Sequence, residues 1–485
     1  MDMGFFSDIA GKSLFFVGIK GTGMSRLAVL LSASGARVTG SDVPMRFSTD
    51  ADLMDARIRV LEDSFFSPLP DGIDMVIHSA AYGPKTNRHL REAEERGIPT
   101  YSYPRFLGLM SKSMHTFGVA GTHGKTTASG CLDWILRKTS LPYVAVYGSH
   151  ILHERTSRNP SGDSFAVLEA CEYRDHFLNY DLDGVLVTTV EHDHPDWFAG
   201  ERDVLESFKR LILRLPDRAP VVCGIDSELC RELAGWVAAT RPTLDVITYG
   251  VHPDSMFRVG SHEDSLCGST YILYPLEGHQ QVKVASLPLC LDVVGACLLG
   301  AAMLLREHRG NDFAHTVATQ AVLQAMLAES ASFPGCAGRV ELLFEEDGIA
   351  YVDDYAHHPT EIAASLENLR SRFAGRRLVT IFFPHTLSRT RMFFDGFVAS
   401  LSRSDLPIIR PVFASARSDG DQRASEELAR LLAERTGGLF FEDEHSLCEV
   451  VAHLLHPCDV CVTMGAGNNS GLARKIADRR RNSRC

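Results

Sequence analysis

The feature that most constrains the fold is a glycine-rich loop between a predicted strand and a predicted helix. The apolar run H-T-F-G-V-A at residues 115–120 has the length and composition of a buried strand, and T-T-A-S-G-C-L-D-W-I-L-R-K from residue 126 is helix-like. The loop itself reads G-T-H-G-K-T-T. A strand that ends in a glycine turn and leads directly into a helix directs backbone N–H groups and the positive end of the helix dipole at one point. This arrangement predicts a polyphosphate site.

The loop is shorter than the common pattern G-x-x-x-x-G-K-[ST], which would place a glycine where this chain has Val119. The shorter form keeps the groups that phosphate binding needs. Gly121 and Gly124 let the backbone approach phosphate oxygens. Lys125 can reach the β- and γ-phosphates, and Thr126 offers a hydroxyl to Mg²⁺. We therefore expect a shorter but intact phosphate loop.

The length of the chain predicts several domains. Its 485 residues exceed one ordinary hydrophobic core. Strand-like and helix-like segments alternate in three successive stretches, as in βαβ units with parallel sheets. We expect three α/β domains, at residues 1–110, 111–330 and 331–485.

Composition excludes several functional classes. The formal net charge of −12 argues against a broad nucleic-acid surface, which needs clustered Lys and Arg. The first residues lack a secretory pattern, so we expect a cytoplasmic protein whose twelve cysteines are reduced. The apolar run at residues 287–305 approaches membrane-spanning length but contains Pro288 and Asp292, which favours a buried helix and no membrane partner.

Polar residues follow two further predicted strands. Glu169 ends the strand-like F-A-V-L-E-A, and His194 lies in E-H-D-H-P-D after G-V-L-V-T-T-V. Side chains at the carboxyl ends of parallel strands meet at one edge of the sheet. The His192 and His194 segment also fits a polar surface loop or a zinc site, although no cysteine lies nearby to favour zinc.

Four other stretches strengthen the interpretation of the loop. They read G-I-K-G-T-G-M-S (18–25), E-A-C-E-Y-R-D-H-F-L (169–178), V-D-D-Y-A-H-H-P-T-E-I (352–362) and F-P-H-T-L-S-R-T-R (383–391). With G-T-H-G-K-T-T they resemble, in order and over nearly the whole chain, the Mur ligases, cytoplasmic enzymes that build the peptide of peptidoglycan precursors. The resemblance implies a Rossmann-like N-terminal domain, a central P-loop ATPase-like domain and a Rossmann-like C-terminal domain.

The resemblance also implies cofactors and substrates. ATP and Mg²⁺ are the expected cofactors. The motifs are most similar to those of the member that joins L-alanine to UDP-N-acetylmuramate, and we expect a monomer or weak homodimer without nucleic-acid or membrane partners. The resemblance leaves open a recycling ligase that attaches a murein peptide to the same sugar nucleotide. A non-catalytic nucleotide-sugar-binding protein is a further alternative.

Site roles carry over from the family residue by residue. The catalytic set is Lys125, Glu169, His194, Arg339 and Arg389. The nucleotide set is Gly121, Thr122, His123, Gly124, Lys125, Thr126, Thr127 and Asp354. The metal set is Thr126 for the Mg²⁺ of the nucleotide, and Glu169 and His194 for a second Mg²⁺. The substrate set is Gly18, Gly21, Gly23, Glu172, His357, His385 and Arg389. Arg389 is expected to bind a carboxylate or phosphate bidentately.

Several positions depart from the family pattern. Lys20 stands where glycine is usual, and Thr189 where asparagine is common. Leu291, Asp292 and Gly295 replace the polar residues of a segment that typically reads H-N-x-x-N-A and holds the adenine. We therefore expect ATP to bind mainly through phosphate and metal contacts. The first glycine loop, read alone with an acidic residue after the second strand, would instead indicate weak nicotinamide-nucleotide binding.

Overall fold

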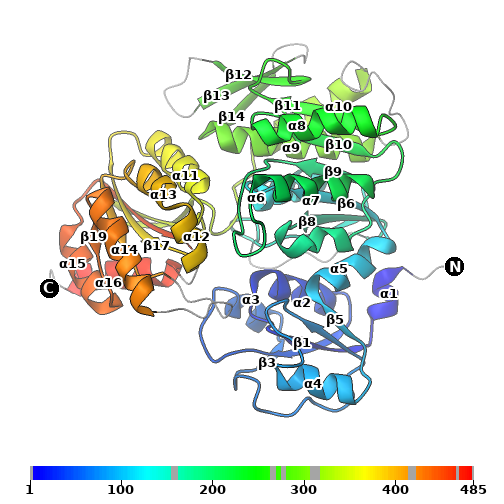
Figure 1. The fold of residues 1–485 in the computed structure, drawn as a ribbon, viewed down its shortest axis with the longest axis horizontal. Helices are drawn as coiled ribbons and strands as arrows, with labels where there is room; N and C mark the ends of the chain where they lie inside the picture. The colour runs from blue at the N-terminus through cyan, green and yellow to red at the C-terminus, as the bar shows by residue number, and fades with distance from the viewer. Residues whose placement is uncertain are drawn as a thin grey trace.

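The computed structural model describes residues 4–154, 162–262, 269–274, 280–305, 317–412, 422–465 and 469–482. It contains three β-sheets that follow one another along the chain. Figure 1 shows three lobes: the N-terminal one in blue at the bottom, the central one in cyan and green above it, and the C-terminal one in yellow to red at the left. The predicted three-domain α/β architecture is confirmed. The exact boundaries stay predictions, and the one at residue 110 falls inside helix α5 (Tyr103–Lys112).

The N-terminal sheet has five parallel strands in the order β3-β2-β1-β4-β5. Its strands are β1 (Ser13–Val17), β2 (Arg37–Ser41), β3 (Arg59–Leu61), β4 (Met75–His78) and β5 (Thr100–Ser102). Its helices are α1 (Phe5–Ile9), α2 (Thr22–Ala33), α3 (Asp50–Asp55), α4 (Arg88–Glu95) and α5. The strand order reverses beside β1, and ligands of open α/β sheets bind at such a point. The predicted glycine loop occupies it, between β1 and α2.

The central sheet has nine strands in the order β14-β13-β12-β11-β10-β9-β6-β8-β7. Seven of them are parallel: β6 (His115–Ala120), β7 (Tyr143–Val146), β8 (Phe165–Ala170), β9 (Gly184–Val187), β10 (Pro220–Gly224), β11 (Asp245–Gly250) and β12 (Phe257–His262). The antiparallel edge strands are β13 (Ser269–Tyr274) and β14 (Gln280–Val284). These two strands were not predicted from the sequence.

Helices cover both faces of the central sheet. They are α6 (Lys125–Leu136), the 3₁₀ helix η1 (Tyr173–Asn179), α7 (Glu201–Leu213), α8 (Glu228–Thr240), α9 (Leu287–Leu304) and α10 (Val317–Ser330). Val221 of β10 packs in the cluster that includes Phe208 of α7, whereas the next residue, Val222, packs with Leu298 of α9 on the opposite face. Successive strand residues point to opposite faces, so both faces of this strand are apolar.

Helix α9 is the apolar run that approached membrane-spanning length. Within the described residues it is the single helix long and apolar enough to cross a membrane, and 67% of that window is buried inside the protein. It packs against α6, α10 and the central strands. The expectation of a buried core helix is therefore confirmed.

The C-terminal sheet has six strands in the order β15-β16-β20-β17-β18-β19, parallel except for the edge strand β15. Its strands are β15 (Glu341–Glu346), β16 (Ile349–Asp354), β17 (Arg377–Phe383), β18 (Leu406–Ile409), β19 (Leu439–Phe440) and β20 (Asp459–Gly465). Its helices are α11 (Pro359–Arg372), α12 (Leu387–Met392), α13 (Phe394–Leu401), α14 (Gln422–Thr436), α15 (Glu444–Leu454) and α16 (Asn469–Asn482). Helix α11 begins with a capping box, in which His358 and Glu361 exchange hydrogen bonds with the backbone.

Candidate active site

The phosphate loop connects β6 to α6, as predicted. Gly121 and Gly124 have φ angles of +136° and +79°, which favour glycine. A Cβ atom on Gly121 would lie 2.0 Å from the hydroxyl oxygen of Thr188 at the end of β9. The backbone N–H of Thr122 donates to the carbonyl of Thr189, at 2.8 Å. The neighbouring strand therefore holds the loop in shape at the N-terminus of α6.

Lys125 lies at the start of α6 and turns back over this loop. Its Nζ atom is 2.9 Å from the carbonyl oxygen of Thr122 and 3.0 Å from Oε2 of Glu172, a buried carboxylate. Burial by itself lowers the pKa of Lys125, but the nearby acidic groups, Glu172 foremost, together outweigh burial and the net pKa is raised. Lys125 is therefore a cation within the phosphate loop.

A hydroxyl and a carboxylate meet at the first turn of α6. The Thr126 hydroxyl donates to Glu169, with oxygen distances of 3.1 and 3.2 Å, and Gly148 N–H donates to Oε2 of Glu169 at 2.8 Å. The Nη2 atom of Arg339 lies 3.3 Å from the same hydroxyl oxygen. Mg²⁺ prefers hard oxygen ligands and keeps part of its water shell, so this pair of oxygen-bearing side chains fits the predicted ion.

His194 lies on the other side of Glu172, and no hydrogen bond or ion pair between described residues joins it to Glu169. Its Nε2 atom is 3.6 Å from Oε1 of Glu172, and its ring lies against Tyr173 with centroids 4.5 Å apart. Burial lowers the pKa of His194, which favours the neutral ring that a metal ligand must have. Oε1 of Glu172 is buried without a hydrogen-bond partner, so a cation or substrate donor at this point would satisfy it.

Arg389 is buried and engaged by a protein carboxylate. Its Nε and Nη2 atoms lie 2.8 and 3.1 Å from the two oxygens of Asp193, and its Nη1 atom lies 3.0 Å from Nδ1 of His385. Burial by itself raises the pKa of Asp193, yet Arg389 and the neighbouring histidines together hold that pKa well below its usual range. Asp193 therefore occupies one side of the guanidinium group, and the expectation that Arg389 binds a substrate carboxylate or phosphate stays a prediction.

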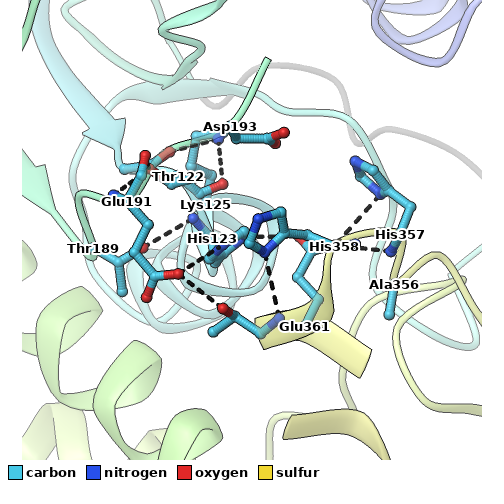
Figure 2. A network of polar contacts seen from close by, with 12 residues as sticks. Thr122, His123, Lys125, Thr189, Glu191, Asp193, Ala356, His357, His358 and Glu361 are labelled. Atoms are coloured by element: carbon cyan, nitrogen blue, oxygen red, sulfur yellow. Dashed lines mark hydrogen bonds and ion pairs between the residues drawn. The ribbon is translucent and has the colours of Figure 1, made fainter. Parts of the chain in front are cut away.

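A second polar cluster joins the phosphate loop to the C-terminal domain (Figure 2). His123 Nδ1 lies 3.2 Å from Oε1 of Glu361, and its Nε2 atom lies 3.4 Å from Oε2 of Glu191. The Thr360 hydroxyl donates to the same Glu191 oxygen at 2.8 Å. Burial lowers the pKa of His123, but the two carboxylates reverse this and raise it to about 10. His123 is therefore an imidazolium between two carboxylates.

This cluster offers metal-type ligands but is better described as a hydrogen-bonded ion cluster. Ligand-type atoms of His123, Glu191 and His358 lie within 4.8 Å of one another. However, Nδ1 of His358 accepts a hydrogen bond from Thr360 N–H at 3.3 Å, so the proton of a neutral ring resides on Nε2. Both nitrogens of His123 face carboxylates. Neither ring presents a lone pair toward a metal.

A cavity of about 1720 Å³ lies between the central and C-terminal domains. Its walls include His123, Gly124, Asp292, Arg339, Asp354 and Glu361. Asp354, which was expected to contact the nucleotide, therefore faces the same space as the phosphate loop. The volume is large enough for a nucleotide, since ligand pockets commonly measure about 300–1,000 Å³.

His357 lies beside His385, with ring centroids 5.8 Å apart. Its Nδ1–H donates to the carbonyl oxygen of Tyr355 at 3.0 Å. Burial lowers the pKa of His357 to about 4. The ring is therefore neutral at physiological pH, and its Nε2 atom is a potential proton acceptor.

The first glycine loop keeps its expected backbone geometry. Gly18 has a φ angle of +78°, and Gly21 is the N-cap of α2. The side chain of Lys20 is buried, with Nζ 2.6 Å from Glu62 and 3.4 Å from Asp50. Lys20 thus neutralises acidic side chains of its own domain, and its ammonium group is not available as an additional phosphate contact.

The altered adenine segment lies in the first turns of α9. An added Cβ on Gly295 would approach the Tyr249 hydroxyl oxygen to 2.6 Å, so Tyr249 fills the space that a longer side chain would need. The Asp292 carboxyl lies against Gly124, where an added Cβ would be 2.1 Å from its Oδ1 atom. Burial raises the pKa of Asp292 to about 8, although Arg339 and His123 act in the opposite direction.

Sequence reasoning missed three acidic residues of the site: Glu191, Asp193 and Glu361. Their partners lie far away in the chain, for example 196 residues for Asp193 and Arg389 and 238 residues for His123 and Glu361. All three lie inside the quoted stretches E-H-D-H-P-D and H-H-P-T-E-I. Their position beside histidines was the signal available in the sequence.

Comparison with known proteins gives concordant results. Family models match three consecutive segments: the catalytic domain of the Mur ligase family at residues 14–115, the Mur ligase middle domain at 119–288, and the Mur ligase glutamate ligase domain at 338–467. The chain is 35% identical over 475 residues to UDP-N-acetylmuramate–L-alanine ligase of Treponema pallidum, covering 97% of each protein.

Solved structures share the fold. A UDP-N-acetylmuramate-alanine ligase from Thermotoga maritima matches with a TM-score of 0.76 and 20% identity, covering 97% of this chain and 99% of that one. A murein peptide ligase from Psychrobacter arcticus 273-4 matches with a TM-score of 0.69 and 19% identity over the same shares. From the three matching domains and the full-length relative, the chain belongs to the Mur ligase family.

Proposed function

We propose that this chain is a cytoplasmic, ATP-dependent ligase that joins L-alanine to the lactyl carboxylate of UDP-N-acetylmuramate in peptidoglycan precursor synthesis. The observation that carries the proposal is the gathering of Lys125, Thr126, Glu169 and Arg339 around one loop. These residues come from separate segments of two domains. The full-length relative named for this reaction supports the choice of substrates.

The reaction must activate an unreactive carboxylate. An oxygen of the lactyl carboxylate attacks the γ-phosphorus of ATP, the bond to the bridging oxygen breaks, and ADP leaves. The alanine amine then attacks the carbonyl carbon of the acyl phosphate, loses a proton, and expels inorganic phosphate. Phosphoryl transfer between anions requires alignment and positive charge around the phosphate oxygens more than covalent help from the protein.

The phosphate loop supplies that charge on the nucleotide side. Lys125 and the N-terminus of α6 face the space of the β- and γ-phosphates, by analogy with other loops that connect a strand to a helix. Arg339 reaches the same point from the segment that leads into the C-terminal domain, and its net pKa is raised, so it is charged. Together these groups stabilise the charge that develops during transfer.

Magnesium fits the oxygen atoms at this point. Thr126 and Glu169 would hold Mg²⁺ beside the nucleotide, and His194 would join Glu169 for the second ion that the family resemblance implies. Bound Mg²⁺ supplies further positive charge to the phosphate oxygens. Glu172 ties Lys125 in place and leaves one oxygen toward His194.

On the amine side, the neutral ring of His357 is suited to accept a hydrogen bond from the attacking amine. Arg389 is proposed to act mainly through His385 and Asp193, which it orients. Closure of the C-terminal domain over the loop would exclude water, which would otherwise hydrolyse the acyl phosphate.

The test is phosphate release on mixing the protein with ATP, Mg²⁺, UDP-N-acetylmuramate and one amine at a time. We expect release to depend on L-alanine and the product mass to equal the sugar nucleotide plus one alanine residue. Release that depends instead on a murein tripeptide would identify the recycling ligase. Binding of the sugar nucleotide without release under any condition would identify a non-catalytic binding protein.

A further inference from the structure

We propose that Glu361 is a positioning residue that couples the nucleotide site to the amino-acid site. This inference rests on the proposed function and goes beyond it, because it predicts that the two substrates bind cooperatively. Glu361 lies in the first turn of α11, in the C-terminal domain, while its two carboxylate oxygens face different partners (Figure 2).

One oxygen of Glu361 holds the phosphate loop. Oε1 lies 3.2 Å from Nδ1 of His123, which sits in the loop between Thr122 and Gly124. Burial raises the cost of any uncompensated charge here, and burial by itself raises the pKa of Glu361. The facing histidines and Arg339 nevertheless hold that pKa well below its usual range, so the carboxylate is ionised.

The other oxygen holds the segment that carries His357. Oε2 accepts hydrogen bonds from the backbone N–H groups of His357, at 3.0 Å, and His358, at 3.3 Å. It also lies 3.4 Å from Nδ1 of His357. The orientation of His357 therefore depends on the same carboxylate that contacts the phosphate loop.

Glu191 provides a second connection between the phosphate loop and helix α11. Glu191 contacts His123 on the central side and accepts the hydroxyl hydrogen bond of Thr360 from α11. The backbone of Glu191 is fixed to the loop, because its N–H donates to the Thr122 hydroxyl at 3.0 Å. The loop and the N-terminus of α11 are thus held at two points, and a shift of one displaces the other.

Coupling between two binding sites is reciprocal. If occupation of the phosphate loop orders the His123–Glu361 contact, the His357 segment is pre-organised for the amine. The factor by which the nucleotide raises the affinity for alanine must then equal the factor by which alanine raises the affinity for the nucleotide. Couplings of this kind commonly lie at about 5- to 150-fold. A substitution that breaks the His123–Glu361 contact should abolish this mutual increase in affinity while leaving both pockets in place.

The experiment measures the dissociation constant of a non-hydrolysable ATP analogue by calorimetry, with UDP-N-acetylmuramate and Mg²⁺ saturating, in the presence and absence of L-alanine. We expect at least ~5-fold tighter binding with alanine in the wild-type protein. In Glu361→Gln we expect a factor near one, because the amide keeps the volume but loses the charge and one of the two acceptors. Glu367→Gln, an exposed change on the same helix, should retain the wild-type factor.

Two substitutions of the loop histidine separate the contacts and guard against a Glu361 variant that fails to fold. The amide of His123→Asn matches the position of Nδ1 and can still donate to Glu361. The amide of His123→Gln matches Nε2 and reaches only toward Glu191. We expect the Asn variant to retain coupling and the Gln variant to lose it, with kcat at saturation of both substrates changed less than the KM for alanine.

Two outcomes overturn the inference. A wild-type protein that ligates alanine yet binds the nucleotide analogue equally well with and without alanine contradicts it. So does a folded, active Glu361→Gln variant with the wild-type coupling factor. Failure of the wild-type protein to ligate alanine at all contradicts the proposed function instead, and the assay reports that result separately.

Discussion

At the scale of single residues, the candidate site combines charged residues that could be predicted from the sequence with charged residues that could not. Lys125, Thr126 and Glu169 could be predicted because each lies at the end of a strand or at the start of a helix, where topology fixes the position of a side chain. Glu361 and Asp193 could not be predicted. Their contacts depend on how two domains dock, and periodicity carries no information about docking.

Lys125 provides a test of the phosphate loop. Lys125→Ala removes a partly buried cation of the phosphate loop and leaves Glu172 without its closest partner. We expect turnover to fall by at least ~10²-fold, as for other groups that stabilise developing charge. Phosphate release under saturating substrates measures the effect. Lys138→Ala, an exposed lysine that follows α6, should leave the rate unchanged, and near-normal turnover in Lys125→Ala would refute the assignment.

Asp292 provides a test based on pH. Burial raises its pKa in the folded state to about 8, whereas the unfolded chain loses this proton near pH 4. Between these values the folded state holds more protons than the unfolded state, so this group makes stability fall as pH rises from about 4 to 8. Below about pH 4 the carboxyl group is protonated in both states, so this group does not destabilise the folded protein.

We therefore expect Asp292→Asn to raise the melting temperature at pH 8.5 by at least ~2 °C more than at pH 5. Melting curves at the two pH values measure the difference. Asp254→Asn, an exposed change, should show no such dependence on pH. An Asp292→Asn variant with equal shifts at both pH values would show that the carboxyl is not held protonated.

At the scale of helices and strands, most of the parallel core was predictable and the sheet edges were not. The strands β6, β8 and β9 are largely apolar runs that match their quoted segments, because strands covered on both faces show an almost uninterrupted apolar signal. The antiparallel strands β14 and β15 are the outermost strands of their sheets, and β13 is the neighbour of β14. Tertiary pairing, more than local sequence, determines those elements.

Helix α9 carries a prediction at this scale. Gly295 allows the helix to approach β11 and β9: an added Cβ would lie 2.6 Å from the Tyr249 hydroxyl oxygen on β11 and 3.0 Å from a Leu186 methyl on β9. Gly295→Asn would restore the residue that is typical of the family at this position. Overpacking of this kind costs about 1–3 kcal/mol, and we expect a loss of that size in the free energy of unfolding.

Chemical denaturation measures this loss. Gly235→Asn on α8 is the matched control, because an added Cβ there meets no atom within 4 Å. We expect the control to lower stability far less. If both variants are equally stable, Tyr249 can move aside, and the departure from the family segment has no packing cause.

At the scale of the whole molecule, three α/β domains serve one reaction. The buried side chain of Arg26 on α2 contacts His150, so the N-terminal domain touches the central domain near the segment that precedes Arg339. The C-terminal domain reaches the phosphate loop through Glu361 and the loop after β9 through Arg389. Because the groups come from separate domains, we expect activity to depend on the relative position of the domains as well as on the residues themselves.

The most direct measurement follows an oxygen atom. UDP-N-acetylmuramate labelled with ¹⁸O in both carboxylate oxygens is incubated with the protein, ATP, Mg²⁺ and L-alanine, and the released phosphate is analysed by mass spectrometry. Transfer of the phosphoryl group to the carboxylate predicts one ¹⁸O atom in each phosphate and one retained in the new amide. Unlabelled phosphate released in step with alanine ligation would contradict the acyl phosphate and the role assigned to the site.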